Sequence, residues 1–93
     1  MQFNLYATFR LIAGVKTLDL PLPAGTTVKQ AVDAVVDAHP VLRPHWLDES
    51  GEIHAHVHIF VNGHDVANFE AGTETQLQQD DVLDFFPPVA GGS

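Results

Sequence analysis

The chain closes with a short apolar run that leads into a proline-glycine tail, Val82-Leu83-Asp84-Phe85-Phe86-Pro87-Pro88-Val89-Ala90-Gly91-Gly92-Ser93. Proline holds φ near −65° and favours an extended conformation, so Pro87-Pro88 predicts a stiff start to the tail. Glycine has no Cβ, so Gly91-Gly92 fits a channel that is too narrow for other residues. At about 3.3 Å per residue, the stretch from Pro87 to Gly92 would reach roughly 20 Å from the body. We therefore expect the tail to enter the active site of another protein.

The composition predicts a single globular domain with protein partners. The chain has 93 residues, 45% of them hydrophobic, and no run approaches the roughly 20 apolar residues of a membrane span. The absence of cysteine excludes a disulfide framework and a cysteine nucleophile within this chain. A net charge of −8 disfavours binding to nucleic acid and favours a partner with a positive docking surface. Because the N-terminus also lacks the basic region of a signal peptide, we expect a cytoplasmic protein with no membrane partner.

The first half of the chain predicts two strands and a helix. Apolar and polar residues alternate from Phe3 to Arg10 and from Leu18 to Leu22, which indicates the two strands of a hairpin. Thr27 and Gln30 have the spacing of a capping box, and alanines and valines then recur at helical spacing. Pro40 ends this helix.

The second half predicts three more strands. Residues 40–51 read as an irregular connection with a helical turn near residues 42–47, and a strand follows from about His54 to Val61. Asn62-Gly63 is a strong hairpin signal. We expect a short returning strand at Asp65-Val66 and the last strand at residues 82–86. This order predicts an α+β, β-grasp fold: a mixed sheet of four to five strands, one main helix, and the last strand in the middle. We expect the domain to span residues 1–86 and the extended tail residues 87–93.

Three segments resemble the MoaD/ThiS family of ubiquitin-like sulfur-carrier proteins. Residues 5–14 are similar to the first strand and turn of that family, and residues 59–63 to its central hairpin. Residues 81–92 match its C-terminal signature, which is the most specific of the three. Together with the order of elements, the resemblance covers nearly the whole domain and implies a ubiquitin-like β-grasp fold.

The resemblance implies that the chain is a carrier rather than an enzyme, with Gly92 as the modified residue. In the family an E1-like adenylyltransferase uses ATP to adenylate the terminal carboxylate, which then becomes a thiocarboxylate. No cofactor is expected to bind the carrier itself. The tail residues Pro87, Pro88, Val89, Ala90 and Gly91 would thread the partner's active site. Candidate docking residues are Phe60, Phe85 and Phe86.

Ser93 departs from the family pattern, in which the second glycine carries the free carboxylate. With Ser93 attached, the Gly92 carbonyl is an amide and cannot be adenylated directly. We expect a peptidase, such as a JAMM-type metalloprotease, to remove Ser93.

Histidines gather around the predicted third strand, and one aromatic residue follows the helix. His54, His56 and His58 alternate, but strand residues two apart lie roughly 7 Å apart, so all three can hardly share one zinc ion. We expect no metal, with His56, His58 and His64 as the weak candidates, and interpret these side chains as an exposed face that could dock a partner. Trp46 is expected to cover one end of the core rather than to anchor a partner.

Several functions fit the same tail. The preferred hypothesis is sulfur donation in molybdopterin (molybdenum cofactor) biosynthesis, with the large subunit of molybdopterin synthase as the sulfur-accepting partner, because residues 85–88 resemble that branch. Sulfur carriage for cysteine synthesis, tRNA thiolation or thiazole synthesis remains open. So do a ubiquitin-like modifier conjugated through Gly92 and a non-covalent β-grasp binding module that is never activated.

Overall fold

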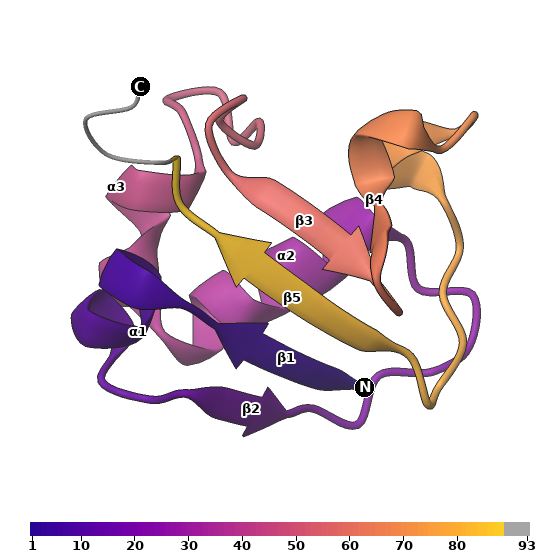
Figure 1. The fold of residues 1–93 in the computed structure, drawn as a ribbon, viewed down its shortest axis with the longest axis horizontal. Helices are drawn as coiled ribbons and strands as arrows, with labels where there is room; N and C mark the ends of the chain where they lie inside the picture. The colour runs from indigo at the N-terminus through magenta and orange to yellow at the C-terminus, as the bar shows by residue number, and fades with distance from the viewer. Residues whose placement is uncertain (89–93) are drawn as a thin grey trace.

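A computed structural model describes residues 1–88 of the chain, and a mixed sheet forms its centre. The sheet has the order β2-β1-β5-β3-β4 (Figure 1), and its strands are β1 (Gln2–Leu5), β2 (Thr17–Asp19), β3 (His58–Val61), β4 (His64–Asp65) and β5 (Val82–Phe86). β5 pairs in parallel with β1 and antiparallel with β3, so the last strand is the central one. The predicted α+β, β-grasp architecture is confirmed.

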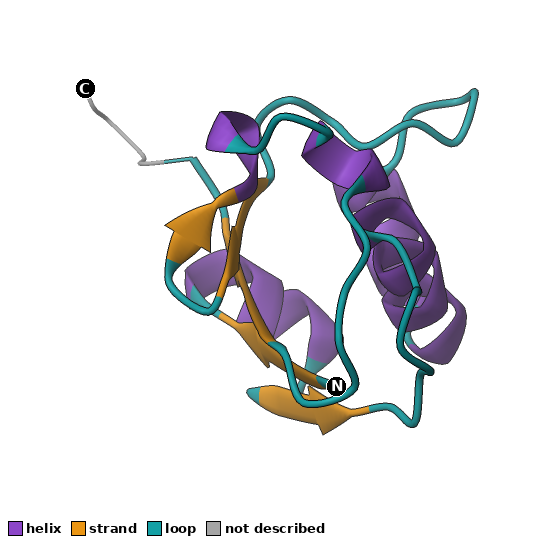
Figure 2. Cartoon of the chain, turned by 90° about the vertical axis from the view of Figure 1, so that its right-hand side faces the viewer, coloured by secondary structure: helices purple, strands orange, loops and turns teal. Residues whose placement is uncertain are grey.

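The main helix, α2 (Val28–Ala38), packs against one face of this sheet, so that sheet and helix form two layers (Figure 2). Its N-terminus has the predicted capping box: the Thr27 hydroxyl accepts a hydrogen bond from the Gln30 amide at 3.1 Å, and the Gln30 side chain accepts one from the Thr27 amide at 3.0 Å. The helix buries its apolar stripe, which consists of Val28, Ala31, Val32, Val35 and Val36. Burial therefore stabilises a valine-rich helix whose intrinsic propensity is modest.

The first predicted strand is wrong beyond Leu5, because the chain forms a helix there. α1 (Ala7–Ala13) follows the N-cap residue Tyr6 and ends at Gly14, which adopts the left-handed conformation with φ 77°. β1 and β2 still pair antiparallel, but α1 separates them, so they do not form a simple hairpin. β2 is also shorter than the strand predicted over residues 18–22.

The predicted helical turn after α2 is confirmed by a 3-10 turn, η1 (Pro40–Leu42), and by α3 (Arg43–Trp46). The predicted strand over residues 54–61 is too long, because β3 begins only at His58 and a turn precedes it, with the Val57 amide donating to the His54 carbonyl at 3.1 Å. Asn62 and Gly63 form the predicted hairpin turn with φ of 50° and 85°. After β4 come two further 3-10 turns, η2 (Val66–Asn68) and η3 (Gly72–Glu74).

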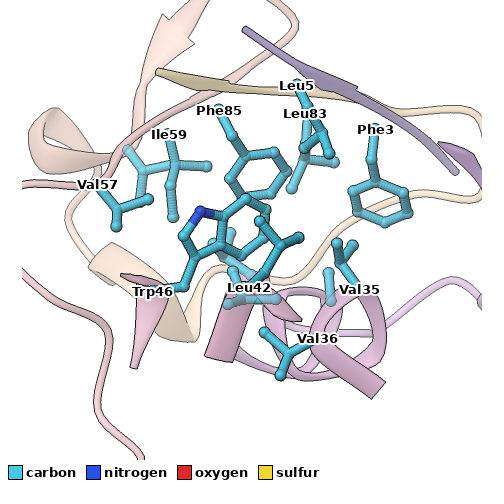
Figure 3. Packing of buried hydrophobic residues seen from close by; sticks show 14 of the residues in the cluster. Phe3, Leu5, Val35, Val36, Leu42, Trp46, Val57, Ile59, Leu83 and Phe85 are labelled. Atoms are coloured by element: carbon cyan, nitrogen blue, oxygen red, sulfur yellow. The ribbon is translucent and has the colours of Figure 1, made fainter. Parts of the chain in front are cut away.

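The core lies between the sheet and the helices, and aromatic rings fill its centre (Figure 3). The Trp46 indole is fully buried; it stacks on Phe85 with ring centroids 4.5 Å apart and meets Phe9 edge to face at 5.5 Å. Trp46 is therefore a core residue, as expected. Its Nε1–H is buried and has no hydrogen-bond partner within the described residues. None of the helices in residues 1–88 has the length and apolar character needed to cross a membrane.

Candidate functional site

The candidate site begins where β5 ends and the tail leaves the sheet. β5 is held on both sides, by β1 with Leu5 opposite Phe85 and by β3 with His58 opposite Phe86. Pro87 and Pro88 follow directly, so the tail starts from the most firmly paired strand of the sheet. The remaining predicted tail residues lie outside the described residues: Val89, Ala90, Gly91, Gly92 and Ser93.

Phe85 faces the core, which corrects its prediction as a docking residue. Its side chain is fully buried and stacks on Trp46, with the Phe3 ring 6.2 Å away. A partner cannot reach it without unfolding the sheet, because alternate strand residues point to opposite faces and this one lies under the helices. The Phe85 side chain therefore anchors the C-terminal end of β5 in the core.

Phe86 points to the opposite, outer face and forms an aromatic row with two neighbours. Its ring stacks on Tyr6 with centroids 4.3 Å apart and meets Phe60 edge to face at 5.5 Å. All three rings are partly exposed, so Phe60 and Phe86 are available for docking. The sequence analysis did not predict Tyr6 as a docking residue. It placed this residue within an extended strand, and that position gave no reason to single it out. We call Tyr6, Phe86 and Phe60 the outer aromatic row.

A shallow hollow of about 500 Å³ adjoins this row on the outer face. It is lined by His58, Phe60, Gly63, Asp84, Phe86 and Pro87, which is mostly apolar surface. The Asp84 carboxylate is held in place by the Asn4 side-chain amide, which donates to it at 2.9 Å. The hollow thus combines an apolar floor, one oriented carboxylate and the first tail residue.

Charge is distributed unevenly between the two halves of the chain. The four Lys and Arg residues all lie between Arg10 and Arg43, whereas nine of the twelve acidic residues lie between Asp48 and Asp84. The segment that forms β3, β4 and β5 is therefore acidic and contains neither lysine nor arginine. A partner that contacts this side of the sheet meets a negative surface, which favours a basic docking face.

The histidines do not line one strand as the sequence predicted. His54 and His56 precede β3; their rings stack with centroids 4.8 Å apart, and His56 Nε2 lies 3.1 Å from the His45 carbonyl oxygen. His58 lies in β3 and His64 in β4. Within residues 1–88, no group of three or more His, Cys, Asp or Glu residues is arranged to hold a metal ion. His56, His58 and His64 are accordingly not brought together as ligands.

One carboxylate in the loop after α3 has a perturbed pKa. The Asp48 side chain accepts hydrogen bonds from the Ser50 hydroxyl at 2.7 Å and from the Ser50 and Glu52 amides. These bonds favour the charged form and lower the pKa of Asp48 below its ordinary value of 3.8, the Ser50 hydroxyl contributing most. Asp48 thus organises the loop that returns from Trp46 toward β3, and not the tail.

The family of this chain is shown by a family model that matches both the domain and the tail. The model of the ThiS family matches residues 3–92, which includes the outer aromatic row and Gly92. The chain belongs to the ThiS family. The resemblance to ubiquitin-like sulfur carriers of the MoaD/ThiS type is thereby confirmed.

Two curated relatives of this ThiS-family chain are modifier proteins of Haloferax volcanii. Small archaeal modifier protein 1 is 35% identical over 99% of this chain and 100% of its own length, and small archaeal modifier protein 3 is 32% identical over 99% and 98%. The crystal structure of the former superposes with a TM-score of 0.87 at 32% identity, over 98% of this chain and 97% of that one.

Two further solved structures of this fold come from other organisms. CysO in the BexX/CysO complex of Amycolatopsis orientalis matches with a TM-score of 0.77 at 27% identity, over 98% of both chains. A putative molybdopterin converting factor, subunit 1, of Pyrococcus furiosus matches with a TM-score of 0.72 at 28% identity, over 95% of both chains. The fold and its relatives are those of ubiquitin-like carriers and modifiers.

Proposed function

We propose that this ThiS-family protein carries sulfur as a thiocarboxylate on Gly92, after a peptidase has removed Ser93. The observation that carries the proposal is that the family match reaches Gly92, while the strand that leads to it is the central one of the sheet. A firmly held strand followed by two prolines suits a tail that must be delivered into another protein. The carrier supplies the acyl group and the docking surface, and the catalysis belongs to its partners.

The chemistry requires activation because a carboxylate is a poor electrophile. The Gly92 carboxylate attacks the α-phosphorus of ATP on an E1-like adenylyltransferase and pyrophosphate leaves, which gives an acyl-adenylate. Hydrosulfide, or an equivalent sulfur donor, then attacks the acyl carbon, AMP leaves, and a thiocarboxylate and one proton result. ATP is consumed by the activating partner, and the carrier itself needs no bound cofactor.

The outer aromatic row is the proposed docking face for the activating enzyme. Phe60 and Phe86 supply partly exposed apolar surface beside Pro87, and Asp84 supplies a carboxylate for a basic group of the partner. The acidic side of the sheet would guide a positively charged enzyme toward the root of the tail.

For the sulfur acceptor we propose the large subunit of molybdopterin synthase, in the cytoplasm. Support comes from the likeness to the molybdopterin converting factor subunit of Pyrococcus furiosus. The likeness to CysO in its complex with BexX supports carriage in general and leaves cysteine synthesis and tRNA thiolation as competing acceptors. A synthase assay with the thiocarboxylated carrier and molybdopterin precursor would separate these acceptors.

A second candidate function is that of a protein modifier, because both curated relatives carry that name. In this case a lysine amine of the target, instead of hydrosulfide, attacks the acyl-adenylate, and an isopeptide bond to Gly92 forms as AMP leaves. Lysines of other proteins that carry a C-terminal peptide of this chain through Gly92, identified by mass spectrometry after proteolysis, would favour this function; trypsin cannot leave a Gly-Gly remnant, because no lysine or arginine follows Arg43.

Three forms of the chain test the proposal: one ending at Gly92, one ending at Ser93 and one ending at Ala90. Each is incubated with its cognate E1-like enzyme, ATP and hydrosulfide, and the intact mass is measured. We expect only the Gly92 form to gain the mass that corresponds to replacing one oxygen by sulfur. Prior treatment with a JAMM-type peptidase should make the Ser93 form reactive. Thiocarboxylation with Ser93 retained, or a Gly92 form that never reacts, would disprove the assignment.

A further inference from the structure

Asp84 is a half-buried carboxylate on the outer face of the sheet that forms none of the ion pairs within residues 1–88. It lies in the central strand, β5 (Figure 1), opposite Asn4 on β1 and Phe60 on β3. No lysine or arginine follows Arg43 in the sequence, so the strands around Asp84 bring no strong cation to it. A charge that is partly withdrawn from water without a counter-ion is costly. Asp84 therefore favours a cation that comes from another molecule.

Hydrogen bonds across three strands fix how this carboxylate is presented. The Thr17 hydroxyl and the Gln2 side-chain amide each donate to the Asn4 side-chain oxygen at 3.1 Å. The Asn4 amide nitrogen is thereby turned the other way, and it donates to Asp84 Oδ1 at 2.9 Å. The second carboxylate oxygen, Oδ2, accepts no hydrogen bond within residues 1–88. Asp84 is thus held from the β1 side and keeps one oxygen for a ligand.

Aromatic surface borders Asp84 on the β3 side. The Phe60 and Phe86 rings meet edge to face with centroids 5.5 Å apart, and both are partly exposed. They line the hollow of about 500 Å³ together with Asp84. We call this space the outer hollow; its lining consists of His58, Phe60, Gly63, Asp84, Phe86 and Pro87. The outer hollow thus combines two rings and one unpaired carboxylate in a mostly apolar space.

We propose that the outer hollow receives an arginine side chain of the activating enzyme, with its guanidinium on the rings and paired with Asp84. A guanidinium is planar and weakly hydrated, so it can stack on a ring while its N–H groups donate to a carboxylate. A lysine ammonium is a compact and strongly hydrated charge, which suits an apolar lining less well. This inference rests on the proposed docking role of the outer aromatic row, and it adds which side chain of the partner that row selects.

Two blocked tripeptides, one with arginine and one with lysine between two glycines, test the outer hollow on the carrier alone. Nuclear magnetic resonance follows their titration into the ¹⁵N-labelled full chain. We expect weak, saturable shift changes centred on residues 58, 60, 84 and 86. The arginine peptide should bind about two- to five-fold more tightly than the lysine peptide, the range expected for an exposed cation–π contact. Equal affinities of the two peptides, or shift changes centred elsewhere, would overturn the proposal.

Two variants separate the contribution of the charge from that of the rings in the same titration. Asp84→Asn keeps an oxygen for the Asn4 amide but removes the charge, so both peptides should bind more weakly. Phe60→Ala keeps the charge but removes a ring, so the two affinities should move closer together. Unchanged binding to Asp84→Asn would also overturn the proposal. The peptides require neither Gly92 nor an enzyme, so a chain that is never thiocarboxylated would refute the proposed function and leave this result standing.

The enzyme is tested with the chain that ends at Gly92. Asp84→Asn should raise the concentration of chain needed for half-maximal activation about 5- to 20-fold, as for a partly exposed hydrogen bond between charged groups, and leave the maximal rate unchanged. Asp19→Asn is the matched control, because it removes the same charge from β2, outside the outer hollow. It should change that concentration less than two-fold. Equal effects of the two variants would indicate a general attraction to acidic surface and would contradict a seated arginine.

Discussion

Phe85 and Phe86 are neighbours in one strand, yet the two side chains serve different halves of the molecule. Phe85 is fully buried and stacks on Trp46, whereas Phe86 lies partly exposed between Tyr6 and Phe60 beside the tail. The difference shows how β5 combines two tasks: its inner face binds the strand into the core, and its outer face displays apolar surface next to Pro87. Stability and docking should therefore be separable by substituting one ring at a time.

The largest effect should come from Phe85→Ala. Removing a fully buried ring from the centre of the core should lower the free energy of unfolding by about 3–5 kcal/mol, from lost burial plus the cavity left beneath Trp46. Domains of this size are stable by only about 5–15 kcal/mol, so a large part of the total would be lost. Urea unfolding followed by tryptophan fluorescence measures the change, since the chain has a single Trp. A loss below about 1 kcal/mol would mean that the inner face does not hold β5 as described.

Phe86→Ala should weaken docking more than it lowers stability. Stability should fall by about 1 kcal/mol, because the ring is only partly buried and loses mainly its two aromatic contacts. If the outer aromatic row docks the activating enzyme, the concentration of Gly92-ending chain needed for half-maximal activation should rise about 5- to 30-fold, as for an interface anchor worth about 1–2 kcal/mol. Val41→Ala, which trims an exposed apolar residue on η1, is the control and should change neither quantity. An unchanged activation curve for Phe86→Ala would place the docking face elsewhere.

The sequence could predict the architecture because its strongest signals are local. The capping box at Thr27, the Asn62-Gly63 turn and the apolar strand 82–86 each depend on a few neighbouring residues, and the structure has all three. The length of a strand cannot be predicted from such local signals, because it depends on how far the partner strand extends. β5 stops at Phe86, so β1 has no neighbour on that side beyond Tyr6, whose amide donates to the Phe85 carbonyl at 3.2 Å, and β3 has none before His58.

Both errors in strand length therefore have the same cause. Once unpaired, residues 7–13 form a helix, and Phe9, Ile12 and Ala13 have the spacing that would have allowed it. Two predictions about the candidate site were also wrong. Tyr6 was missed because it was placed within a strand, and Phe85 was assigned to docking although Asp84 shares a face with Phe86 and could have marked that face as the outer one.

The smallest effect should come from the Asp48 loop, which supports only the inner face. This loop connects Trp46 to the start of β3, and the His54 amide donates to the Trp46 carbonyl at 2.9 Å across it. The pKa of Asp48 is lowered in the folded state by the hydrogen bonds from Ser50 and Glu52, so its carboxylate stabilises the fold above the ordinary value of 3.8. That contribution is lost as the pH falls through the lower folded value.

Asp48→Asn should therefore be slightly less stable than the parent chain at pH 7, and the difference should shrink as the pH is lowered below 3.8. Urea unfolding of both proteins across this range measures it. Glu49→Gln is the matched control, since it removes a neighbouring charge whose side chain makes no hydrogen bond within residues 1–88. Activation of the Gly92-ending chain should stay the same in both variants, because the loop contributes no residue to the outer aromatic row or to the hollow beside it. A stability difference that does not vary with pH would show that the charge of Asp48 plays no part in holding Trp46 over Phe85.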